Sequence, residues 1–294
     1  MADPPVLCPL VTPFDDDAVD ADALAALVER LRSIGLDGFV PCGTTGEFAS
    51  LTVEERRTVI ETTVEAAGDA TVLAGVADTT VDGVRAGIAH ADAVGADGAL
   101  TTLPYFHGAN DPEGELRFLR EATADAGLPV YLYNIPPYVG REIPPDVISR
   151  AAETDAVKGL KDTSDDLSYL RRVDRRTPDD FPIYQGIDSL YLPSVLVGAT
   201  GGIHAVSNAL PEAFVALRDA VADGDLDRAR TVATAAIEPV FEACAEYGFA
   251  PATKVAAAER GFVDDASVRA PLIELDADER ADVEAAVRSA LDAV

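Results

Sequence analysis

The sequence predicts an α/β fold, a (β/α)8 TIM barrel with a C-terminal helical extension. Three observations predict it. Eight short apolar runs alternate with amphipathic, helix-like stretches along the 294 residues. The third to seventh runs follow one another at roughly 25 to 33 residues, which is the length of a βα unit. The runs are continuous rather than alternating, as strands buried on both faces of a parallel sheet should be.

A helix-like stretch follows each expected strand. The clearest expected helix spans residues 52–68. Thr52 and Glu55 have the spacing of a capping box at its start, and Gly68 ends it. A second expected helix spans residues 111–127. The expected strands span residues 6–11, 37–42, 71–77, 97–103, 130–135, 157–161, 182–186 and 201–206.

The last quarter of the chain predicts helices without a further strand. The eighth βα unit ends near residue 223, and helical stretches then span 225–248 and 276–294. We therefore expect a barrel of residues 1–223 and a helical extension, residues 224–294, that packs on it. The alternative is an open doubly wound sheet. Its dinucleotide-binding form is not favoured, because no G-x-G-x-x-G follows the first strand.

The charge of the chain excludes some partners. The formal net charge is −29, from 52 acidic and 23 basic residues. Nucleic acid and anionic membrane surfaces are excluded as partners, because phosphate contacts need clustered Lys and Arg. The chain has three lysines and twenty arginines. An acidic surface with few lysines indicates a halophilic protein, and the alternative is an ordinary acidic cytosolic protein.

Cysteine and histidine usage indicates a cytoplasmic protein without a metal site. Cys8, Cys42 and Cys244 are isolated and form no CxxC pair, so neither zinc nor a disulfide framework is expected. The three histidines, His90, His107 and His204, lack metal-ligand spacing. The first residues carry no basic segment before a long apolar one, so no signal peptide is expected. No apolar run approaches the roughly 20 residues of a membrane span.

Barrel active sites lie at the C-terminal ends of the strands. In this sequence the motif GTTGE (43–47) directly follows the second expected strand. Its backbone N–H groups and the hydroxyls of Thr44 and Thr45 can hold a small anion such as a carboxylate. The alternative is an ordinary turn before the helix that Thr52 caps.

Lys161 and Tyr133 are expected at the ends of adjacent strands. Lys161 is the last residue of the strand 157–161, on the opposite face from Lys158. An enclosed, partly apolar position favours the neutral amine, which is the form that attacks a carbonyl. A nearby phenol can shuttle protons. The alternatives are a surface lysine paired with Asp162 or Asp165, and a core tyrosine.

Three motifs in this order resemble one enzyme superfamily. GTTGE, YNIP (133–136) and GLKDT (159–163) are similar to those of the dihydrodipicolinate synthase / N-acetylneuraminate lyase superfamily of class I, Schiff-base aldolases. VTPF, QGID, GGIHAVSN and the C-terminal helices extend the resemblance over nearly the whole chain. It implies a TIM barrel that uses pyruvate and needs no metal or organic cofactor.

The resemblance also implies residue roles. Lys161 forms an imine with the keto carbon of pyruvate, and Tyr133 relays protons. Thr44 and Thr45 hold the pyruvate carboxylate, and Thr44 takes part in the proton relay. Pocket-lining positions are Gly186 and Ile203, through their backbones. The family is usually a homotetramer, a dimer of dimers, with the pair Tyr105–Phe106 near the tight dimer contact.

Two departures from the synthase pattern favour another substrate. Phe106 replaces the tyrosine that reaches the neighbouring subunit's proton relay. Tyr138 replaces the arginine that grips aspartate semialdehyde, although Arg141 lies three residues on. GLKDT instead resembles the archaeal 2-keto-3-deoxy-(phospho)gluconate aldolases of carbohydrate metabolism, whose aldehyde is glyceraldehyde or its 3-phosphate. Tyr105, Tyr138 and Ser207 are expected to contact the sugar acid.

Several alternatives to this aldolase stay open at the level of sequence. One is 4-hydroxy-tetrahydrodipicolinate synthase, which condenses pyruvate with aspartate semialdehyde. Others are further pyruvate lyases and family dehydratases that use the same imine. An alternative of a different class is a non-catalytic barrel that binds pyruvate or a sugar acid. The presence of both Lys161 and Tyr133 favours a lyase over the binding protein.

The charge excess predicts that salt stabilises the fold. Self-repulsion between acidic side chains weakens the compact state, and salt screens it as the Debye length falls from roughly 10 Å at 0.1 M to roughly 3 Å at 1 M. We expect the melting temperature to rise steadily between roughly 0.1 M and 3 M KCl. Thermal unfolding followed by circular dichroism measures it. A melting temperature that does not rise would contradict the halophilic interpretation.

Overall fold

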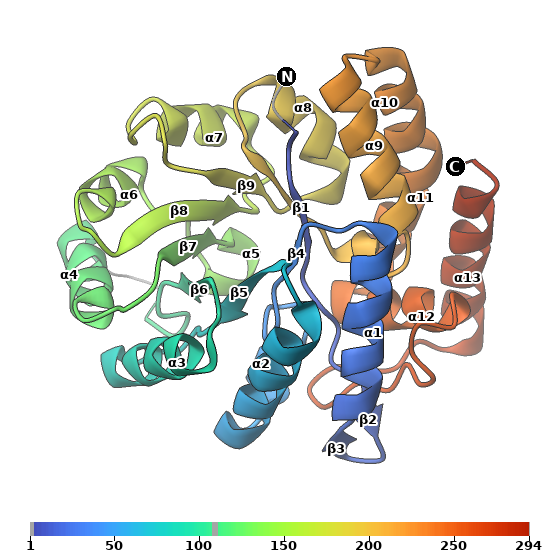
Figure 1. Cartoon of the computed structure of the whole chain (residues 1–294), viewed down its shortest axis with the longest axis horizontal. Coiled ribbons are helices and arrows are strands. Elements are labelled where there is room, and N and C mark those ends of the chain that lie inside the picture. The colour runs from blue at the N-terminus through green and yellow to red at the C-terminus, as the bar shows by residue number, and fades with distance from the viewer. Residues whose placement is uncertain (1–2, 108–110, 294) are drawn as a thin grey trace. The chain divides into compact units, whose positions relative to one another are not determined.

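The computed structural model describes residues 3–107 and 111–293, so Gly108 of the fourth loop and Val294 of the last predicted helix lie outside it. Eight parallel strands close into a barrel in the order β1-β10-β9-β8-β7-β6-β5-β4 (Figure 1). The predicted (β/α)8 barrel is confirmed, and each strand of the barrel lies within or overlaps a predicted one. The strands are β1 (Val6–Cys8), β4 (Gly38–Phe39), β5 (Thr71–Gly75), β6 (Gly98–Thr102), β7 (Val130–Asn134), β8 (Val157–Asp162), β9 (Ile183–Gln185) and β10 (Gly201–Ile203).

One compact unit of the chain comprises Leu73–Gly202. In Figure 1 its helices α3, α4, α6 and α7 lie on the outer side of the strands β6 to β8. Each helix returns the chain to the start of the next parallel strand. The helices are α3 (Val81–Val94), α4 (Pro112–Thr123), α5 (Pro136–Val139), α6 (Pro145–Ala152), α7 (Leu167–Asp174), the 3-10 turn η2 (Asp188–Leu190) and α8 (Tyr191–Leu196).

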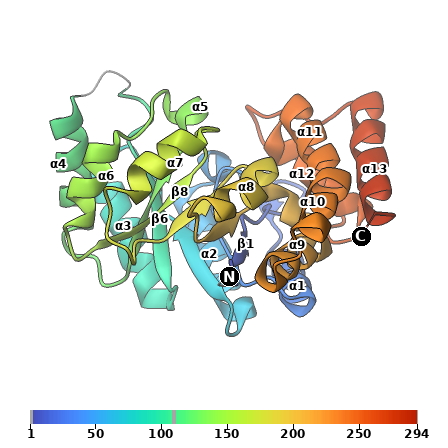
Figure 2. The same cartoon turned by 90° about the horizontal axis from the view of Figure 1, so that it is seen from above.

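The other compact unit joins Met1–Val72 to Ile203–Val294. It contains the helices that follow the eighth strand, and Figure 2 shows α9 to α13 beside one another. The predicted domain boundary at residue 223 falls inside this unit and stays a prediction. Its further elements are β2 (Phe14–Asp15), β3 (Ala18–Val19), α1 (Ala21–Ile34), η1 (Phe48–Ser50), α2 (Val53–Ala67), η3 (Ala205–Asn208), α9 (Pro211–Asp223), α10 (Leu226–Val232), the π-helical turn η4 (Ala233–Ile237), α11 (Glu238–Tyr247), α12 (Phe249–Glu259) and α13 (Ala277–Leu291).

Helix boundaries follow local chemistry. The capping box of α2 is confirmed, because the Thr52 side chain accepts from the Glu55 N–H and the Glu55 side chain accepts from the Thr52 N–H. Two predicted helices need correction. The helix at 111–127 begins at Pro112 and ends at Thr123, and the one at 225–248 is divided into α10, η4 and α11. Pro239, in the first turn of α11, has no N–H to continue a regular ladder, and the π-helical turn lies directly before it.

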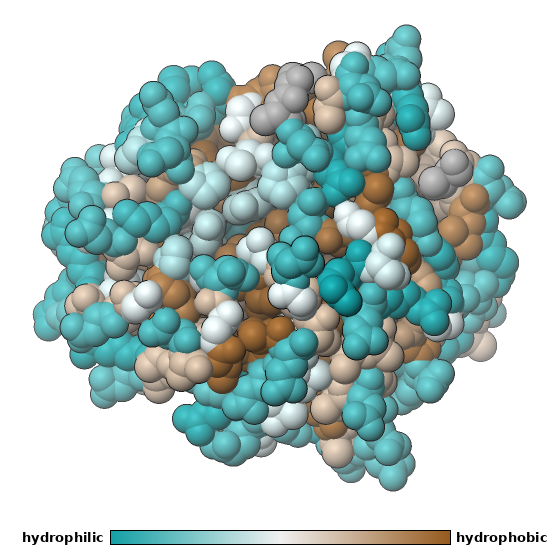
Figure 3. All heavy atoms as spheres, viewed as in Figure 1, coloured by the Kyte–Doolittle hydropathy of each residue, from teal (hydrophilic) through white to brown (hydrophobic). Residues whose placement is uncertain are grey.

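Hydrophilic residues occupy most of the face drawn in Figure 3, with smaller apolar areas between them. This distribution agrees with a chain that carries 52 acidic residues. Among the described residues, no helix has the length and apolar character that crossing a membrane requires.

The register between β7 and β8 places Tyr133 directly beside Lys161. Val130 pairs with Val157 and Tyr131 with Gly159, so the ladder skips Lys158, which is exposed. The strand continues through Asp162, which pairs with Asn134 and Gln185. Lys161 is therefore the penultimate residue of its strand, and the prediction that it is the last was wrong by one. A strand buried on both faces can accept the extra carboxylate because its oxygens have partners.

Asp162 holds the ends of β7 and β8 together. Its Oδ1 accepts from Asn134 Nδ2 at 2.8 Å, and its Oδ2 accepts from Ser164 Oγ at 3.1 Å. Asn134 Oδ1 accepts from the Ile143 N–H at 2.9 Å. Burial raises the pKa of Asp162 to about 6, although the hydrogen bonds from Asn134 and Ser164 oppose the shift. Ionisation of Asp162 is thus less favourable in the folded chain than in the unfolded one.

This raised pKa predicts a pH-dependent stability. A carboxyl whose folded pKa lies above its unfolded value makes the free energy of unfolding fall as pH rises from roughly 4 to roughly 6. Asp162→Asn keeps the hydrogen-bonding shape without the charge. We expect it to be more stable than the wild type at pH 8, by at most about 3 kcal/mol, with the difference fading near pH 4.

Urea unfolding at both pH values measures the difference. The exposed Asp179 provides the control, since Asp179→Asn should leave the free energy of unfolding nearly unchanged at pH 4 and at pH 8. A difference for Asp162→Asn that is the same at pH 4 and pH 8 would contradict the expected titration.

Candidate active site

Lys161 and Tyr133 form the centre of the candidate site in the unit Leu73–Gly202. The two residues pair across β7 and β8, and Lys161 Nζ lies 4.3 Å from the centroid of the Tyr133 ring. Only 4% of Lys161 and 6% of Tyr133 is exposed. Lys161 forms no ion pair with the described residues, and the neighbouring Asp162 is occupied by Asn134 and Ser164. The alternative of a surface lysine paired with Asp162 or Asp165 is therefore wrong.

Gly186 lies against Lys161 at the end of β9. Its N–H donates to the Asp162 carbonyl at 2.7 Å. A Cβ at this position would lie 2.1 Å from Thr163 Oγ1 and 3.0 Å from Lys161 Cε. Only glycine leaves room for the lysine side chain and the threonine hydroxyl, so the structure brings Gly186 together with Lys161 and Tyr133.

Two threonines next to this centre were not singled out from the sequence. Thr102, at the end of β6, pairs with Tyr133, and Thr163 follows the Lys161 strand. Within the described ranges, the buried hydroxyls of Thr102 and Thr163 have no hydrogen-bond partner. Thr163 could have been predicted from the sequence, because it is the last residue of the GLKDT motif. Thr102 could not, because only its hydroxyl without a partner distinguishes it from an ordinary core threonine. Both can bind a polar substrate group.

The GTTGE loop belongs to the other compact unit, Met1–Val72 with Ile203–Val294. The Glu47 N–H donates to the Thr44 carbonyl at 3.1 Å and the Phe48 N–H to the Gly43 carbonyl at 3.3 Å. The N–H groups of Thr44, Thr45 and Gly46 have no backbone acceptor among the described residues. Thr44 is half-buried and Thr45 is buried. The loop therefore offers unused donors, as an anion site needs.

Ile203 and Ser207 lie in the same unit, at the end of β10 and in η3. Ile203 is buried at 1% exposure. Ser207 is fully buried, and its hydroxyl donates to the His204 carbonyl at 2.6 Å. The hydroxyl proton of Ser207 is thus used within the chain, and its expected contact with a sugar acid stays a prediction.

The aromatic residues expected around the substrate are exposed. Tyr105 is 40%, Phe106 82% and Tyr138 60% exposed. Phe106 contacts the ring of His107 edge-on, at 5.8 Å between centroids. Burial raises the pKa of Tyr138, and Tyr133 adds to the shift.

Arg141 is held by a buried acidic residue. Its Nε lies 2.5 Å from Glu115 Oε1, and the side chains are 14% and 2% exposed. The two terminal guanidinium nitrogens have no hydrogen-bond partner among the described residues. The positive charge of Arg141 is therefore already neutralised by Glu115, which the sequence did not reveal because α4 and the loop after α5 are far apart in the chain.

Neither metal chemistry nor thiol chemistry is indicated near these residues. Among residues 3–107 and 111–293, no group of three or more His, Cys, Asp and Glu side chains could hold a metal ion. Burial raises the pKa of Cys42, next to the GTTGE loop, to about 12. Its thiol therefore stays protonated, and a buried thiol is a poor nucleophile.

The chain is similar to known proteins over nearly its full length. It matches the dihydrodipicolinate synthetase family over residues 4–290. The 4-hydroxy-tetrahydrodipicolinate synthase of Methanothrix thermoacetophila is 37% identical over 223 residues, 75% of each chain. An uncharacterised DapA-like lyase of Halobacterium salinarum is 36% identical over 282 residues, 95% of this chain and 91% of its own.

A solved structure, KD(P)GA from T. tenax, is 27% identical, with a TM-score of 0.90 over 99% of this chain and 100% of its own. Family relatives are thus named both as a synthase and as KD(P)GA. Schiff-base chemistry on pyruvate is common to the family, which excludes the alternative of a non-catalytic binding barrel. The chain belongs to the dihydrodipicolinate synthetase family and is a class I, pyruvate-dependent aldolase of that family.

Proposed function

We propose that this protein cleaves 2-keto-3-deoxygluconate, or its 6-phosphate, to pyruvate and glyceraldehyde or its 3-phosphate. The observation that carries the proposal is the buried pair of Arg141 and Glu115. Aspartate semialdehyde brings its own carboxylate, and arginine is the residue that pairs with carboxylates through charged, often bidentate hydrogen bonds. Tyr138 stands where that arginine is expected, and Arg141 is already neutralised.

Lys161 is the proposed nucleophile. Its neutral amine attacks the keto carbon, the carbinolamine loses water, and the resulting protonated imine withdraws electrons from the chain of the substrate. Cleavage between C3 and C4 then releases the aldehyde and leaves an enamine, which takes up a proton and is hydrolysed to pyruvate. Tyr133, paired with Lys161, is the proposed proton relay, and the predicted place of the pyruvate carboxylate is on Thr44 and Thr45.

A hydroxylated aldehyde suits the polar groups near Lys161. The buried hydroxyls of Thr102 and Thr163 lack partners among the described residues, and Tyr138 provides a phenol. An uncharged chain of hydroxyls needs only such hydrogen-bond partners. A buried hydroxyl left without a partner costs about 1–3 kcal/mol, so a ligand that satisfies it gains by that amount.

The second candidate is 4-hydroxy-tetrahydrodipicolinate synthase. It is favoured by the name of a relative that is 37% identical, whereas KD(P)GA from T. tenax is 27% identical. Arg141 decides between them. If its side chain leaves Glu115 when substrate binds, it supplies the missing cation.

The quaternary structure and setting are proposed on separate grounds. The exposed ring of Phe106 suits burial by a second copy, as the family resemblance predicts for the tight contact of a homotetramer. The similarity to a protein of Halobacterium salinarum supports the halophilic proposal. A cytoplasmic location remains a proposal from the isolated cysteines.

Lys161 should be the residue that forms the imine. Borohydride reduction in the presence of pyruvate should add one pyruvate-derived mass to the peptide that contains Lys161. Lys161→Ala should lower kcat by roughly a thousand-fold or more, as loss of a nucleophile does. Lys158→Ala is the matched control and should keep its rate, because Lys158 is exposed. Activity that survives Lys161→Ala would refute the mechanism.

The substrate proposal predicts a ranking of kcat/KM. Pyruvate release from 2-keto-3-deoxygluconate or its 6-phosphate should exceed condensation with aspartate semialdehyde by roughly 10- to 100-fold, the value of one charged hydrogen bond. A coupled assay on both reactions measures the ratio.

The matched variant removes the buried pair, Arg141→Met with Glu115→Gln, so that no charge is left unpaired. We expect both reactions to keep their ratio in this variant. Efficient condensation in the wild type that collapses in the variant would show that Arg141 reaches the substrate, and the synthase would then be the function.

A further inference from the structure

Two residues, one directly before the GTTGE loop and one at its end, have a backbone conformation that they disfavour. Cys42 has φ 55° and Glu47 has φ 57°, values of the left-handed region. A Cβ on Gly46 would lie 2.7 Å from the Leu10 carbonyl oxygen, so the loop also packs too closely for a side chain there. Residues in this region persist where the surroundings impose the conformation. Contacts outside the loop must therefore hold it.

Glu47 supplies such contacts through a carboxylate with no exposed surface. Its Oε1 lies 2.6 Å from Lys254 Nζ, and its Oε2 accepts from the Arg269 N–H at 3.1 Å. Lys254, on α12, donates to the Ser267 carbonyl at 2.7 Å and lies 3.9 Å from the centroid of the Phe14 ring. One carboxylate thus joins the loop to α12 and to residues 267–269.

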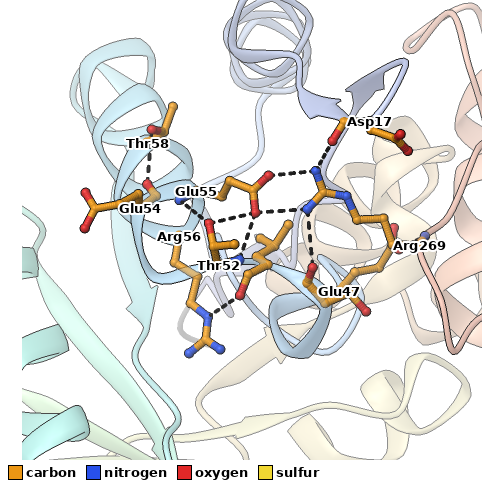
Figure 4. A network of polar contacts seen from close by, with 10 residues as sticks. Asp17, Glu47, Thr52, Glu54, Glu55, Arg56, Thr58 and Arg269 are labelled. Carbon is orange, nitrogen blue, oxygen red and sulfur yellow. Dashed lines mark hydrogen bonds and ion pairs between the residues drawn. The ribbon is translucent and has the colours of Figure 1, made fainter.

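A second pair fixes the helix that follows the loop to the same segment. The Arg269 guanidinium reaches Glu55 at 2.7 and 2.9 Å, and it also donates to the Asp17 carbonyl. Figure 4 shows this guanidinium between Glu55 and Asp17, with Glu47 and Thr52 beside it. The hydrogen bond from Arg269 lowers the pKa of Glu55 to about 2.

The buried pair of Glu47 and Lys254 is poorly explained by stability alone. Burial lowers the pKa of Lys254, and Glu47 opposes that shift. Removing two charges from water costs about as much as their attraction returns, so apolar replacement of a whole pair is often neutral or stabilising. A buried ion pair can instead fix the positions of the segments that carry it, because either charge is unfavourable in the interior without its partner. The geometry that it fixes here is that of Thr44 and Thr45, two and three residues before Glu47.

We propose that Glu47 and Lys254 are positioning residues that hold the GTTGE loop ready for the carboxylate of pyruvate, so that α12 and residues 267–269 set the affinity for pyruvate. The inference rests on the proposed placement of that carboxylate on Thr44 and Thr45. It does not depend on which aldehyde the enzyme uses.

The test measures imine formation and loop protection in the same variants. Borohydride trapping at increasing pyruvate gives the half-saturating concentration, and hydrogen exchange followed by mass spectrometry reports on residues 43–51. The variants are Glu47→Gln, Lys254→Met, the double variant Glu47→Gln/Lys254→Met and the conservative Lys254→Arg. Arg57→Ala is the control, because it breaks an exposed pair with Glu54 on the nearby helix α2.

Glu47→Gln and Lys254→Met should raise the half-saturating pyruvate concentration at least about ten-fold and speed exchange in 43–51, while trapping at saturation reaches the wild-type level. The double variant leaves no unpaired charge, so its melting temperature should recover while its pyruvate affinity does not. Lys254→Arg should restore part of the affinity, and Arg57→Ala should change nothing. If the single variants fail to fold, the double variant decides.

Wild-type half-saturation and wild-type exchange in a folded double variant would overturn the inference and leave the pair a purely structural one. A wild-type protein that forms no imine would instead refute the proposed function. Faster exchange in the loop without a change in half-saturation would show that the clamp exists but that pyruvate does not bind the loop, which also overturns the inference.

Discussion

Burial of the strand ends is the constraint on which the candidate site depends. In a closed parallel barrel both faces of a strand are covered, so every polar group placed there needs a partner or a use. Asp162 has partners in Asn134 and Ser164. Lys161, one residue earlier and 4% exposed, has no ion pair within the described ranges. Its amine is therefore not engaged by a neighbouring carboxylate and is placed to attack a ketone.

Local patterns predicted the barrel because its signals are local. Apolar runs revealed all eight strands, and the Thr52–Glu55 spacing located the start of α2. Seven of the eight strand lengths were overestimated, since apolar residues continue into the buried loops beyond the last ladder hydrogen bond, whereas β8 extends one residue past its predicted end. The extra residue at Lys158 and the π-helical turn before Pro239 were missed for a related reason. Both depend on how one element meets its neighbour, which hydrophobic periodicity does not report.

The sequence predicted those residues of the site that lie at the ends of strands. The neighbouring positions of Tyr133 and Lys161 follow from the order of sequential βα units. The pairs Glu115–Arg141 and Glu47–Lys254 join segments that are distant in the chain, and no single-sequence pattern marks them. Yet these pairs carry the substrate argument and the loop argument. A buried ion pair depends on which distant segments meet in the fold, whereas a strand end is marked by the residues next to it in the sequence.

The three lysines show that the exposed surface and the buried positions have different requirements for basic residues. Twenty arginines against three lysines indicate that the exposed surface disfavours lysine. Lys158, which the ladder between β7 and β8 skips, is exposed. Lys161 and Lys254 are only 4% and 1% exposed, so a preference for arginine on the protein surface does not act on them. Arginine could not replace Lys161, because its guanidinium stays protonated and cannot form an imine. At Lys254, arginine would keep the positive charge but would present a larger, planar group to Glu47, the Ser267 carbonyl and the Phe14 ring. A lysine that remains in such a chain therefore marks a position that uses the chemistry of a primary amine or its small size.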